Sequence, residues 1–161
     1  MVHRFAVDKM LGRLASWLRI LGQDATYGAH LSGRTLVRHA RTEGRVILTR
    51  DRRLSRQHTD VPLLLIASDH FREQVRQVLT AFSINPLEHL FTRCARCNDP
   101  VILVPKEEIA GRVPPYVYAT QTRFVRCPRC QRIYWPATHA ERVRREIESL
   151  SRPPCAHAGR T

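Results

Sequence analysis

The 161-residue sequence has no long apolar run, and this lack excludes a membrane-spanning helix. Such a helix needs roughly 20 consecutive apolar residues, and no stretch of the chain approaches that length. Residues 1–17 also lack the uninterrupted apolar segment and the small-residue cleavage site of a secretory signal. With 43% hydrophobic residues the chain can still bury a core. The sequence therefore predicts a soluble globular protein of the cytoplasm.

Acidic residues and lysines are both scarce. The chain has 14 Asp and Glu residues against 27 Lys and Arg residues, a net charge of +13 at pH 7. Lys9 and Lys106 are the only lysines, so arginine supplies the excess. Because arginine binds phosphate with two parallel hydrogen bonds, this composition favours a polyanionic partner. A basic protein without a specific partner, or a compositional bias of the source genome, is the alternative interpretation.

The first 85 residues alternate between strand and helix patterns. The expected strands lie at 3–7, 45–49 and 62–67, and the expected helices at 10–21, 32–44 and 69–82. The apolar run at 62–67 is typical of a strand buried on both faces, whereas 23–33 and 52–60 carry turn-forming and polar residues and are expected to be loops. This alternation predicts an α/β fold with a mostly parallel sheet flanked by helices.

The composition and pattern of the sequence change after residues 83–92. Short extended pieces and frequent prolines follow, and a last amphipathic helix is expected at 140–150. We therefore predict three regions: a sheet domain at 1–85, a small module at 91–150 that ends in this helix, and a disordered tail at 151–161.

Four of the five cysteines form two identical pairs. Cys94 and Cys97 are separated by two residues, as are Cys127 and Cys130, and 29 residues lie between the pairs. Two such pairs can place four thiolates around one ion, the arrangement of a zinc ribbon. A site with four thiolates has no open position, so its zinc would be structural. Two disulfides, which conflict with a cytoplasmic location, or iron in place of zinc are the alternatives.

Three aspartates follow the three expected strands. Asp8, Asp51 and Asp69 come after the first, second and third of them. Ligands of an open parallel sheet bind beyond the carboxyl ends of its strands, so these side chains are candidates for one site. A Mg²⁺ or Mn²⁺ ion held by Asp8 and Asp51, with Asp69 assisting, would suit phosphodiester cleavage. The alternative is that these aspartates only end strands or cap helices, as Asp69 could.

Basic residues near these aspartates and cysteines are candidates for nucleic-acid binding. They lie on the expected first helix, around Asp51 and inside the two cysteine pairs, and are Lys9, Arg13, Arg50, Arg52, Arg96 and Arg129. Guanidinium groups bind phosphate oxygens, and Tyr134 and Trp135 could add stacking on bases. Packing against the sheet domain is an equally good use for these two aromatic residues.

Several stretches together resemble the Mut-seven C-terminal RNase family. They are "FAVDKMLGRLASWLRILGQDATY", "EGRVILTRDRRL", "SDHFREQVRQVL", "FTRCARCNDP" and "FVRCPRCQRIYW", and the resemblance covers roughly residues 3–148. This family is a branch of the PIN-like nucleases with a zinc ribbon at the C-terminal end. The resemblance implies a PIN-like α/β fold and a metal-dependent RNase activity. By position, it also implies that Asp8 and Asp51 are acids of the nuclease site and that the four ribbon cysteines bind zinc.

The sequence departs from this family's pattern at one functional position. Family members usually carry an acid at the start of the second helix, where this chain has Ser32, Gly33 and Arg34. Two hypotheses follow: a metal-dependent endoribonuclease whose ribbon assists RNA binding, or an RNA-binding or ribosome-associated factor with a weak or inactive site. The RNA could be tRNA or ribosomal RNA. A zinc-ribbon DNA-binding regulator is a third possibility, but no recognition helix supports it.

Overall fold

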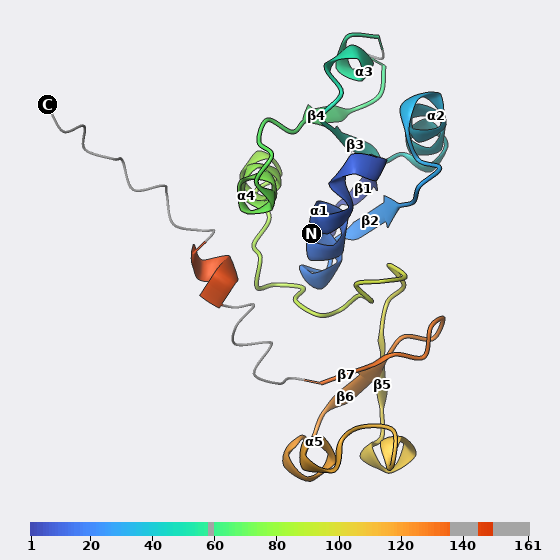
Figure 1. Cartoon of the computed structure of the whole chain (residues 1–161), viewed down its shortest axis with the longest axis vertical. Helices are drawn as coiled ribbons and strands as arrows, with labels where there is room; N and C mark the ends of the chain where they lie inside the picture. The colour runs from blue at the N-terminus through green and yellow to red at the C-terminus, as the bar shows by residue number, and fades with distance from the viewer. Residues whose placement is uncertain (58–59, 136–144, 150–161) are drawn as a thin grey trace, which may run out of the picture.

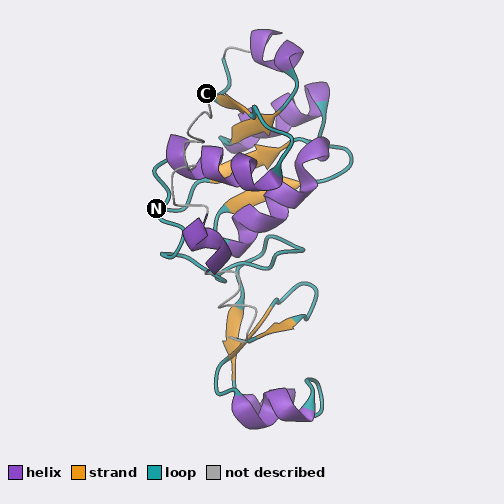
Figure 2. Ribbon diagram, turned by 60° about the vertical axis from the view of Figure 1, so that its left-hand side comes forward, coloured by secondary structure: helices purple, strands orange, loops and turns teal. Residues whose placement is uncertain are grey.

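The N-terminal part of the protein is a parallel β-sheet between two layers of helices (Figures 1 and 2). The computed structural model describes residues 1–57, 60–135 and 145–149. The sheet has the order β2-β1-β3-β4, and all neighbouring strands are parallel. Its strands are β1 (Arg4–Val7), β2 (Asp24–Tyr27), β3 (Val46–Thr49) and β4 (Leu63–Leu65). The predicted PIN-like α/β arrangement is confirmed.

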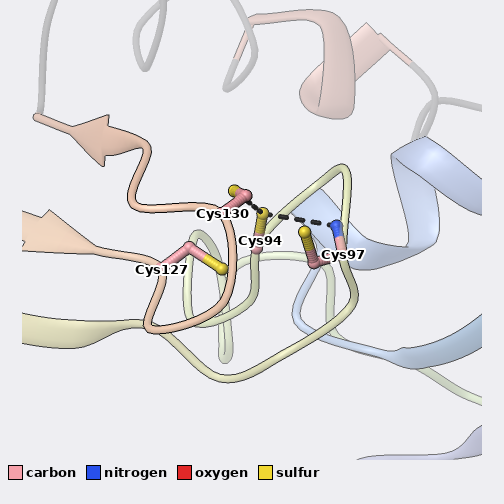
Figure 3. Close-up of side chains that lie close together, drawn as sticks. All are labelled: Cys94, Cys97, Cys127 and Cys130. Atoms are coloured by element: carbon pink, nitrogen blue, oxygen red, sulfur yellow. Dashed lines mark hydrogen bonds between the residues drawn. The ribbon is translucent and has the colours of Figure 1, made fainter.

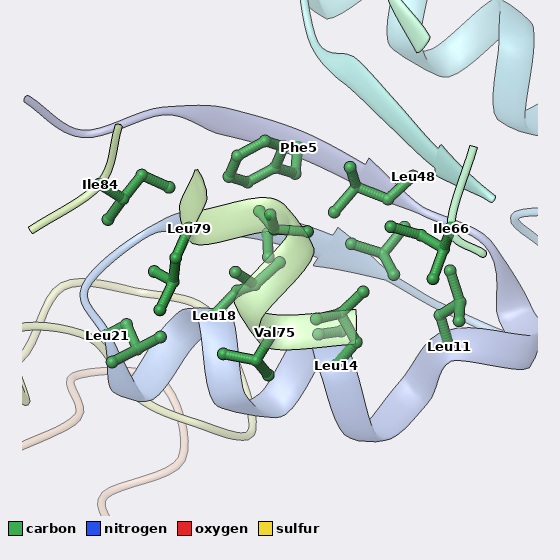
Figure 4. Packing of buried hydrophobic residues seen from close by; sticks show 14 of the residues in the cluster. Phe5, Leu11, Leu14, Leu18, Leu21, Leu48, Ile66, Val75, Leu79 and Ile84 are labelled. Carbon is green, nitrogen blue, oxygen red and sulfur yellow. The ribbon is translucent and has the colours of Figure 1, made fainter. Parts of the chain in front are cut away.

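The helices lie on both faces of this sheet. They are the short 3₁₀ helix η1 (Lys9–Leu11), α1 (Gly12–Ile20), α2 (Gly33–Glu43), α3 (Arg52–Gln57) and α4 (Phe71–Ala81). Helices α1 and α4 pack on one face through the core cluster shown in Figure 4. Helices α2 and α3 supply apolar residues to a second cluster on the other face. The carboxyl edge of the sheet, where β1 and β3 end, lies between these layers.

Alternation along the two central strands explains this three-layer arrangement. Phe5 and Val7 of β1 belong to the α1–α4 cluster, whereas Ala6 between them belongs to the other. In β3, Leu48 belongs to the α1–α4 cluster and Ile47 belongs to the other. All five side chains are fully buried, and burial stabilises each of the larger ones by about 1.5–3 kcal/mol. The central strands are therefore fixed from both sides.

Helix α2 begins and ends where its sequence signals predict. Ser32 precedes it in an extended conformation, and the hydroxyl of Thr35 accepts a hydrogen bond from the Ser32 N–H (3.3 Å). Gly44 ends it in the left-handed conformation with a φ of 60°. Because glycine adopts this φ without a steric penalty, it is the usual residue at this position.

In the first 85 residues, two elements lie where none was expected, and one strand differs from its prediction. The interpretation of 23–33 and 52–60 as loops was wrong, because β2 and α3 lie within them. Strand β2 has four residues at the edge of the sheet and only Ala25 fully buried, so no apolar run marks it. Strand β4 is also an edge strand, and its three leucines are half-buried rather than buried on both faces.

The region after residue 91 forms a separate antiparallel sheet, drawn below the first one in Figure 1. Its order is β5-β6-β7, with β5 at Ile102–Val104, β6 at Phe124–Arg126 and β7 at Ile133–Tyr134. The connection between β5 and β6 contains η2 (Lys106–Ile109) and α5 (Pro115–Thr120). A small core of Val104, Ile109, Val113 and Phe124 holds this region together.

Buried polar contacts join the two sheets. Arg19, near the end of α1 and only 6% exposed, donates hydrogen bonds to the carbonyl oxygens of Ala95 (3.2 Å) and Arg96 (2.8 Å). The Asn98 side chain donates to Asp24 (2.7 Å) and accepts from the Ala25 N–H (3.0 Å). Asp24 begins β2, so these contacts lie at the amino edge of the parallel sheet.

The expected helix at 140–150 is described only over 145–149, which is helical. Ile147 is 1% exposed and belongs to the core cluster of α1 and α4, and Glu146 pairs with Arg72 of α4. This part of the chain therefore packs on the parallel sheet domain. The predicted tail at 151–161 and Cys155 lie outside the described residues. Within the described ranges, no helix has the length and apolar character that crossing a membrane requires.

Replacing Gly22 by alanine should destabilise the protein more than replacing Gly44. Both glycines have left-handed φ angles, +77° and +60°, so both changes strain the backbone. A Cβ atom at Gly22 would lie 2.1 Å from the His89 carbonyl oxygen. A Cβ atom at Gly44 would have no atom of the described residues within 4 Å, apart from its chain neighbours. We expect Gly22→Ala to lower the free energy of unfolding by about 1–3 kcal/mol more than Gly44→Ala in urea titrations. Equal losses would contradict close packing of α1 against the segment around His89.

Candidate functional site

Thr49 links two of the predicted acids at the carboxyl edge of the sheet. It is the last residue of β3 and is fully buried. Its hydroxyl donates a hydrogen bond to Asp8 Oδ2 (2.6 Å) and accepts one from the Asp51 N–H (3.0 Å). The Asp8 carboxylate and the Asp51 backbone N–H therefore share one hydroxyl partner across the pairing of β1 and β3.

Asp8 is a buried carboxylate with a single neutral partner. It is 4% exposed, and its backbone N–H continues the pairing of β1 by donating to the Leu48 carbonyl oxygen (3.0 Å). Among the described residues, its carboxylate receives one hydrogen bond, from Thr49, and no basic group lies within 4.0 Å of it. Burying a carboxylate without a cation is costly, so the surroundings of Asp8 favour a bound positive charge.

Asp51 begins helix α3 and is half-buried. One carboxylate oxygen, Oδ1, accepts a hydrogen bond from the Arg53 N–H (2.8 Å), which is the geometry of a helix cap. Asp51 therefore caps α3 through Oδ1, which agrees with the capping interpretation of these aspartates. No hydrogen bond to Oδ2 is formed within the described ranges, so Oδ2 is the oxygen that could bind an ion.

Asp69 has surroundings different from those of Asp8 and Asp51. Its side chain is 75% exposed and forms an ion pair with Arg50. It does not cap α4, whose first turn receives no side-chain cap. Over the described part of the chain, no three carboxylates have ligand atoms within 4.8 Å of one another. A role for Asp69 in a metal site stays a prediction.

The start of α2 lies beside Asp8. The Lys9 N–H donates to the Leu31 carbonyl oxygen (3.1 Å), which fixes this turn against the end of β1. Residues 32–34 supply no carboxylate here, and Arg34 is exposed. The position where the resembling family carries a further acid is therefore adjacent to the site in space but cannot contribute a ligand.

The four predicted zinc ligands meet in one cluster (Figure 3). Cys94, Cys97, Cys127 and Cys130 are free thiols, and their sulfur atoms all lie within 4.8 Å of one another. The Cys94 and Cys130 sulfurs are 3.7 Å apart. Tetrahedral zinc with Zn–S bonds of about 2.3 Å places its sulfurs about 3.8 Å apart, so the cluster fits zinc. The disulfide alternative is wrong for these four residues.

The two cysteine loops have the same backbone geometry. In the first, the Asn98 N–H donates to the Cys94 carbonyl oxygen (2.9 Å); in the second, the Gln131 N–H donates to Cys127 (3.0 Å). Asn98 and Gln131 have φ angles of 70° and 59°. Each loop thus turns through a left-handed residue directly after its second cysteine, which directs both of its thiols toward the other loop.

Hydrogen bonding favours the thiolate at Cys94. Burial alone would raise its pKa, but the Tyr134 hydroxyl (3.1 Å) and the N–H groups of Cys97 and Arg96 donate to its sulfur and lower the pKa to about 6. Burial and the neighbouring thiolates raise the pKa of Cys97 to about 12 and also raise that of Cys127. The Cys94 thiol therefore ionises readily, whereas a bound cation would favour ionisation of Cys97 and Cys127.

Comparison with known proteins identifies the family of the chain. The model of the Mut7-C RNAse domain family matches residues 3–147. The chain belongs to this family. Comparison with curated proteins gives no significant match. Membership in the Mut7-C RNAse family indicates a nuclease-like role on RNA.

The Mut7-C fold places the acids and the cysteine loops at opposite edges of the parallel sheet. Asp8 follows the last residue of β1, whereas Asn98 and Arg19 fix the first cysteine loop beside Asp24, the first residue of β2. Four residues of β1 span about 13 Å. Of the predicted nucleic-acid ligands, Lys9, Arg13, Arg50 and Arg52 thus lie on the side of the acids, and Arg96 and Arg129 on the side of the four cysteines.

Sequence reasoning missed three polar residues that organise this Mut7-C domain. Thr49 connects the acids, and Arg19 and Asn98 connect the cysteine loop to the sheet. A polar residue at the end of an apolar strand was the available signal for Thr49. No pattern marks Arg19 or Asn98, because the contacts between the cysteine loop and the sheet join residues more than 70 positions apart in the sequence.

The protein is expected to bind one zinc ion, and Cys97→Ser is expected to lose it. Because zinc binds the folded cluster only, the loss should lower the free energy of unfolding, by about 4 kcal/mol where free zinc exceeds its Kd a thousandfold. Elemental analysis and thermal unfolding with and without a chelator measure both effects. Cys155→Ser is the control and should retain zinc. Zinc retained by Cys97→Ser would contradict the assignment.

Proposed function

We propose that the protein is a metal-dependent ribonuclease whose site is centred on Asp8 and Asp51. The observation that carries the proposal is the buried Asp8 carboxylate, which has only the Thr49 hydroxyl as a partner among the described residues. A buried carboxylate beside a second one suits a hard divalent cation such as Mg²⁺ or Mn²⁺. Such an ion would activate water and stabilise charge on the phosphate that is cleaved.

Each side chain of the site has a distinct part in this proposal. Asp8 and Asp51 hold the ion, with Asp8 Oδ1 and Asp51 Oδ2 as the available oxygens. Thr49 is a positioning residue, since its uncharged hydroxyl contacts the Asp8 carboxylate and the backbone N–H of Asp51. Asp69 assists only when it separates from Arg50, because its carboxylate is exposed and ion-paired.

Basic residues on the same edge would hold the RNA backbone. Lys9, Arg13 and Arg52 are exposed there, and Arg50 becomes available where its pair with Asp69 opens. Arg96 and Arg129 would bind RNA on the module that carries the four cysteines. An RNA bound to both regions would pass over the edge strand β2. Structured RNAs such as tRNA or ribosomal RNA, acting in the cytoplasm, fit this arrangement.

The start of α2 favours a second function on the same fold, an RNA-binding or ribosome-associated factor with little turnover. Residues 32–34 lie beside Asp8 and include Arg34 but no acid. A missing ligand weakens cation binding, whereas an additional guanidinium strengthens phosphate binding. This factor would bind RNA in a strongly salt-dependent manner without cleaving it.

Cleavage of a labelled RNA in Mn²⁺ tests the first function. We expect EDTA to abolish cleavage and Asp8→Asn or Asp51→Asn to lower its rate about 100-fold or more, because each removes a charge but keeps the shape. Asp69→Asn should have a smaller effect. Asp60→Asn is the control, since Asp60 is an exposed partner of Arg41 before β4. Cleavage that survives in the Asp8 and Asp51 variants would show that the activity arises elsewhere.

Restoring an acid at the start of α2 separates the two functions. We expect Gly33→Asp to increase cleavage at low Mn²⁺, because it adds a carboxylate beside Asp8. Gly33 has a φ of +51°, which aspartate tolerates better than most residues, and nothing lies within 4 Å of a Cβ atom there. Gly33→Asn has the same shape without the charge and serves as the control. Equal activity in both variants would contradict a role for the missing acid.

A further inference from the structure

Arg13 differs from the other basic residues near the acids in the way it is held. Its guanidinium carbon lies 3.6 Å from the centre of the Phe71 ring. Arg13 is in the first turn of α1, and Phe71 is the first residue of α4. Both helices begin at the carboxyl edge of the sheet, where Asp8 and Asp51 lie. The stacked pair therefore bridges two helices on the α1–α4 side of the site.

Arg13 donates no hydrogen bond to any residue that the structure describes. Over the described ranges, no carboxylate lies within 4.0 Å of its guanidinium, and the side chain is exposed. Stacking on a ring occupies the face of a guanidinium and leaves its N–H groups, which point outward in its plane, free to bind a ligand. The ring thus orders the cation without neutralising it.

Arg72 on the same ring is a natural comparison. Its guanidinium carbon is 5.8 Å from the Phe71 centre, and its Nε donates to Glu146 (2.6 Å). Arg50 is likewise paired, with Asp69. Of these three arginines, only Arg13 is both ordered by an aromatic ring and without an acidic partner in the described residues.

We propose that Arg13 binds a phosphate of the RNA substrate and that Phe71 is the positioning residue that holds its guanidinium ready. This inference rests on the proposed function and names one phosphate contact of the same site. The planar fork of donors suits two oxygens of a phosphodiester. Since an ordered side chain loses less entropy on binding, the ring should contribute to affinity without touching RNA.

Binding of a fluorescein-labelled single-stranded RNA to the full zinc-bound chain tests the inference, by anisotropy in EDTA-free buffer without Mn²⁺ at several salt concentrations. We expect Arg13→Gln to weaken binding about tenfold and to reduce the slope of log K against log salt by about 0.7, the contribution of one phosphate contact. Arg72→Gln should change neither value. Arg13→Lys should keep most of the slope but lose affinity, because a lysine keeps the charge and loses the planar stack.

A double-mutant cycle tests the role of Phe71. Phe71→Leu should weaken RNA binding in the wild-type background but not in Arg13→Gln, whereas Phe71→Trp should restore wild-type affinity. A purely structural role of Phe71 would weaken binding equally in both backgrounds and would overturn the inference. Unchanged binding by Arg13→Gln would also overturn it while leaving the ribonuclease proposal intact. No RNA binding by the wild-type protein would instead refute the proposed function itself.

Discussion

The parallel pairing of β1 with β3 is the constraint on which the candidate site depends. Its register sets Val7 opposite Leu48, and the Asp8 N–H extends the pairing by donating to the Leu48 carbonyl oxygen. Thr49 then follows on the neighbouring strand at the height of Asp8. Side chains alternate between the two faces of a strand. A shift of β3 by one residue would therefore turn its apolar side chains to the opposite faces and move the Thr49 hydroxyl away from Asp8. The apolar clusters on both faces oppose that shift, so core packing keeps the Thr49 hydroxyl beside the Asp8 carboxylate.

The zinc cluster depends on the same domain through α1. Arg19 reaches the carbonyl oxygens of the first cysteine loop from inside the core, and Asn98 returns two hydrogen bonds to the start of β2. Asp24, which accepts one of them, also pairs with the buried Arg45; burial would raise the Asp24 pKa, but these hydrogen bonds hold it below its usual range. A loop tied to buried groups in this way orders its two cysteines before a metal binds. The energy of zinc binding should therefore stabilise the parallel sheet as well as the small antiparallel one.

Sequence patterns predict elements whose own residues determine them and miss those fixed by distant partners. Helix α2 has Ser32, Gly44 and an amphipathic stripe, and its bounds agree with the prediction. Strand β2 has one buried residue and forms because β1 offers an edge to pair with, so periodicity does not reveal it. The cysteine spacing predicts a four-ligand cluster, because local turns set the geometry of each pair. The carboxylates lack such local constraints: the Thr49 hydroxyl contacts the Asp8 carboxylate and the Asp51 backbone, whereas Asp69 forms an ion pair with Arg50.

The charge distribution at the carboxyl edge relates the two proposed functions to each other. Asp8 and Asp51 would give the proposed site a negative centre. Lys9 and Arg13 follow β1, Arg52 follows β3 and Arg34 lies in the first turn of α2, and all four are exposed. In these proposals, the two aspartates would bind a divalent cation and the basic residues would bind an RNA phosphate. The relative strength of these two interactions would decide whether bound RNA is cleaved. The start of α2 carries Arg34 and no acid. Its charge therefore favours RNA binding over cation binding. Under the second proposed function, the fold would lose turnover through this change of charge and keep its affinity for RNA, because the proposed phosphate contacts do not depend on the metal.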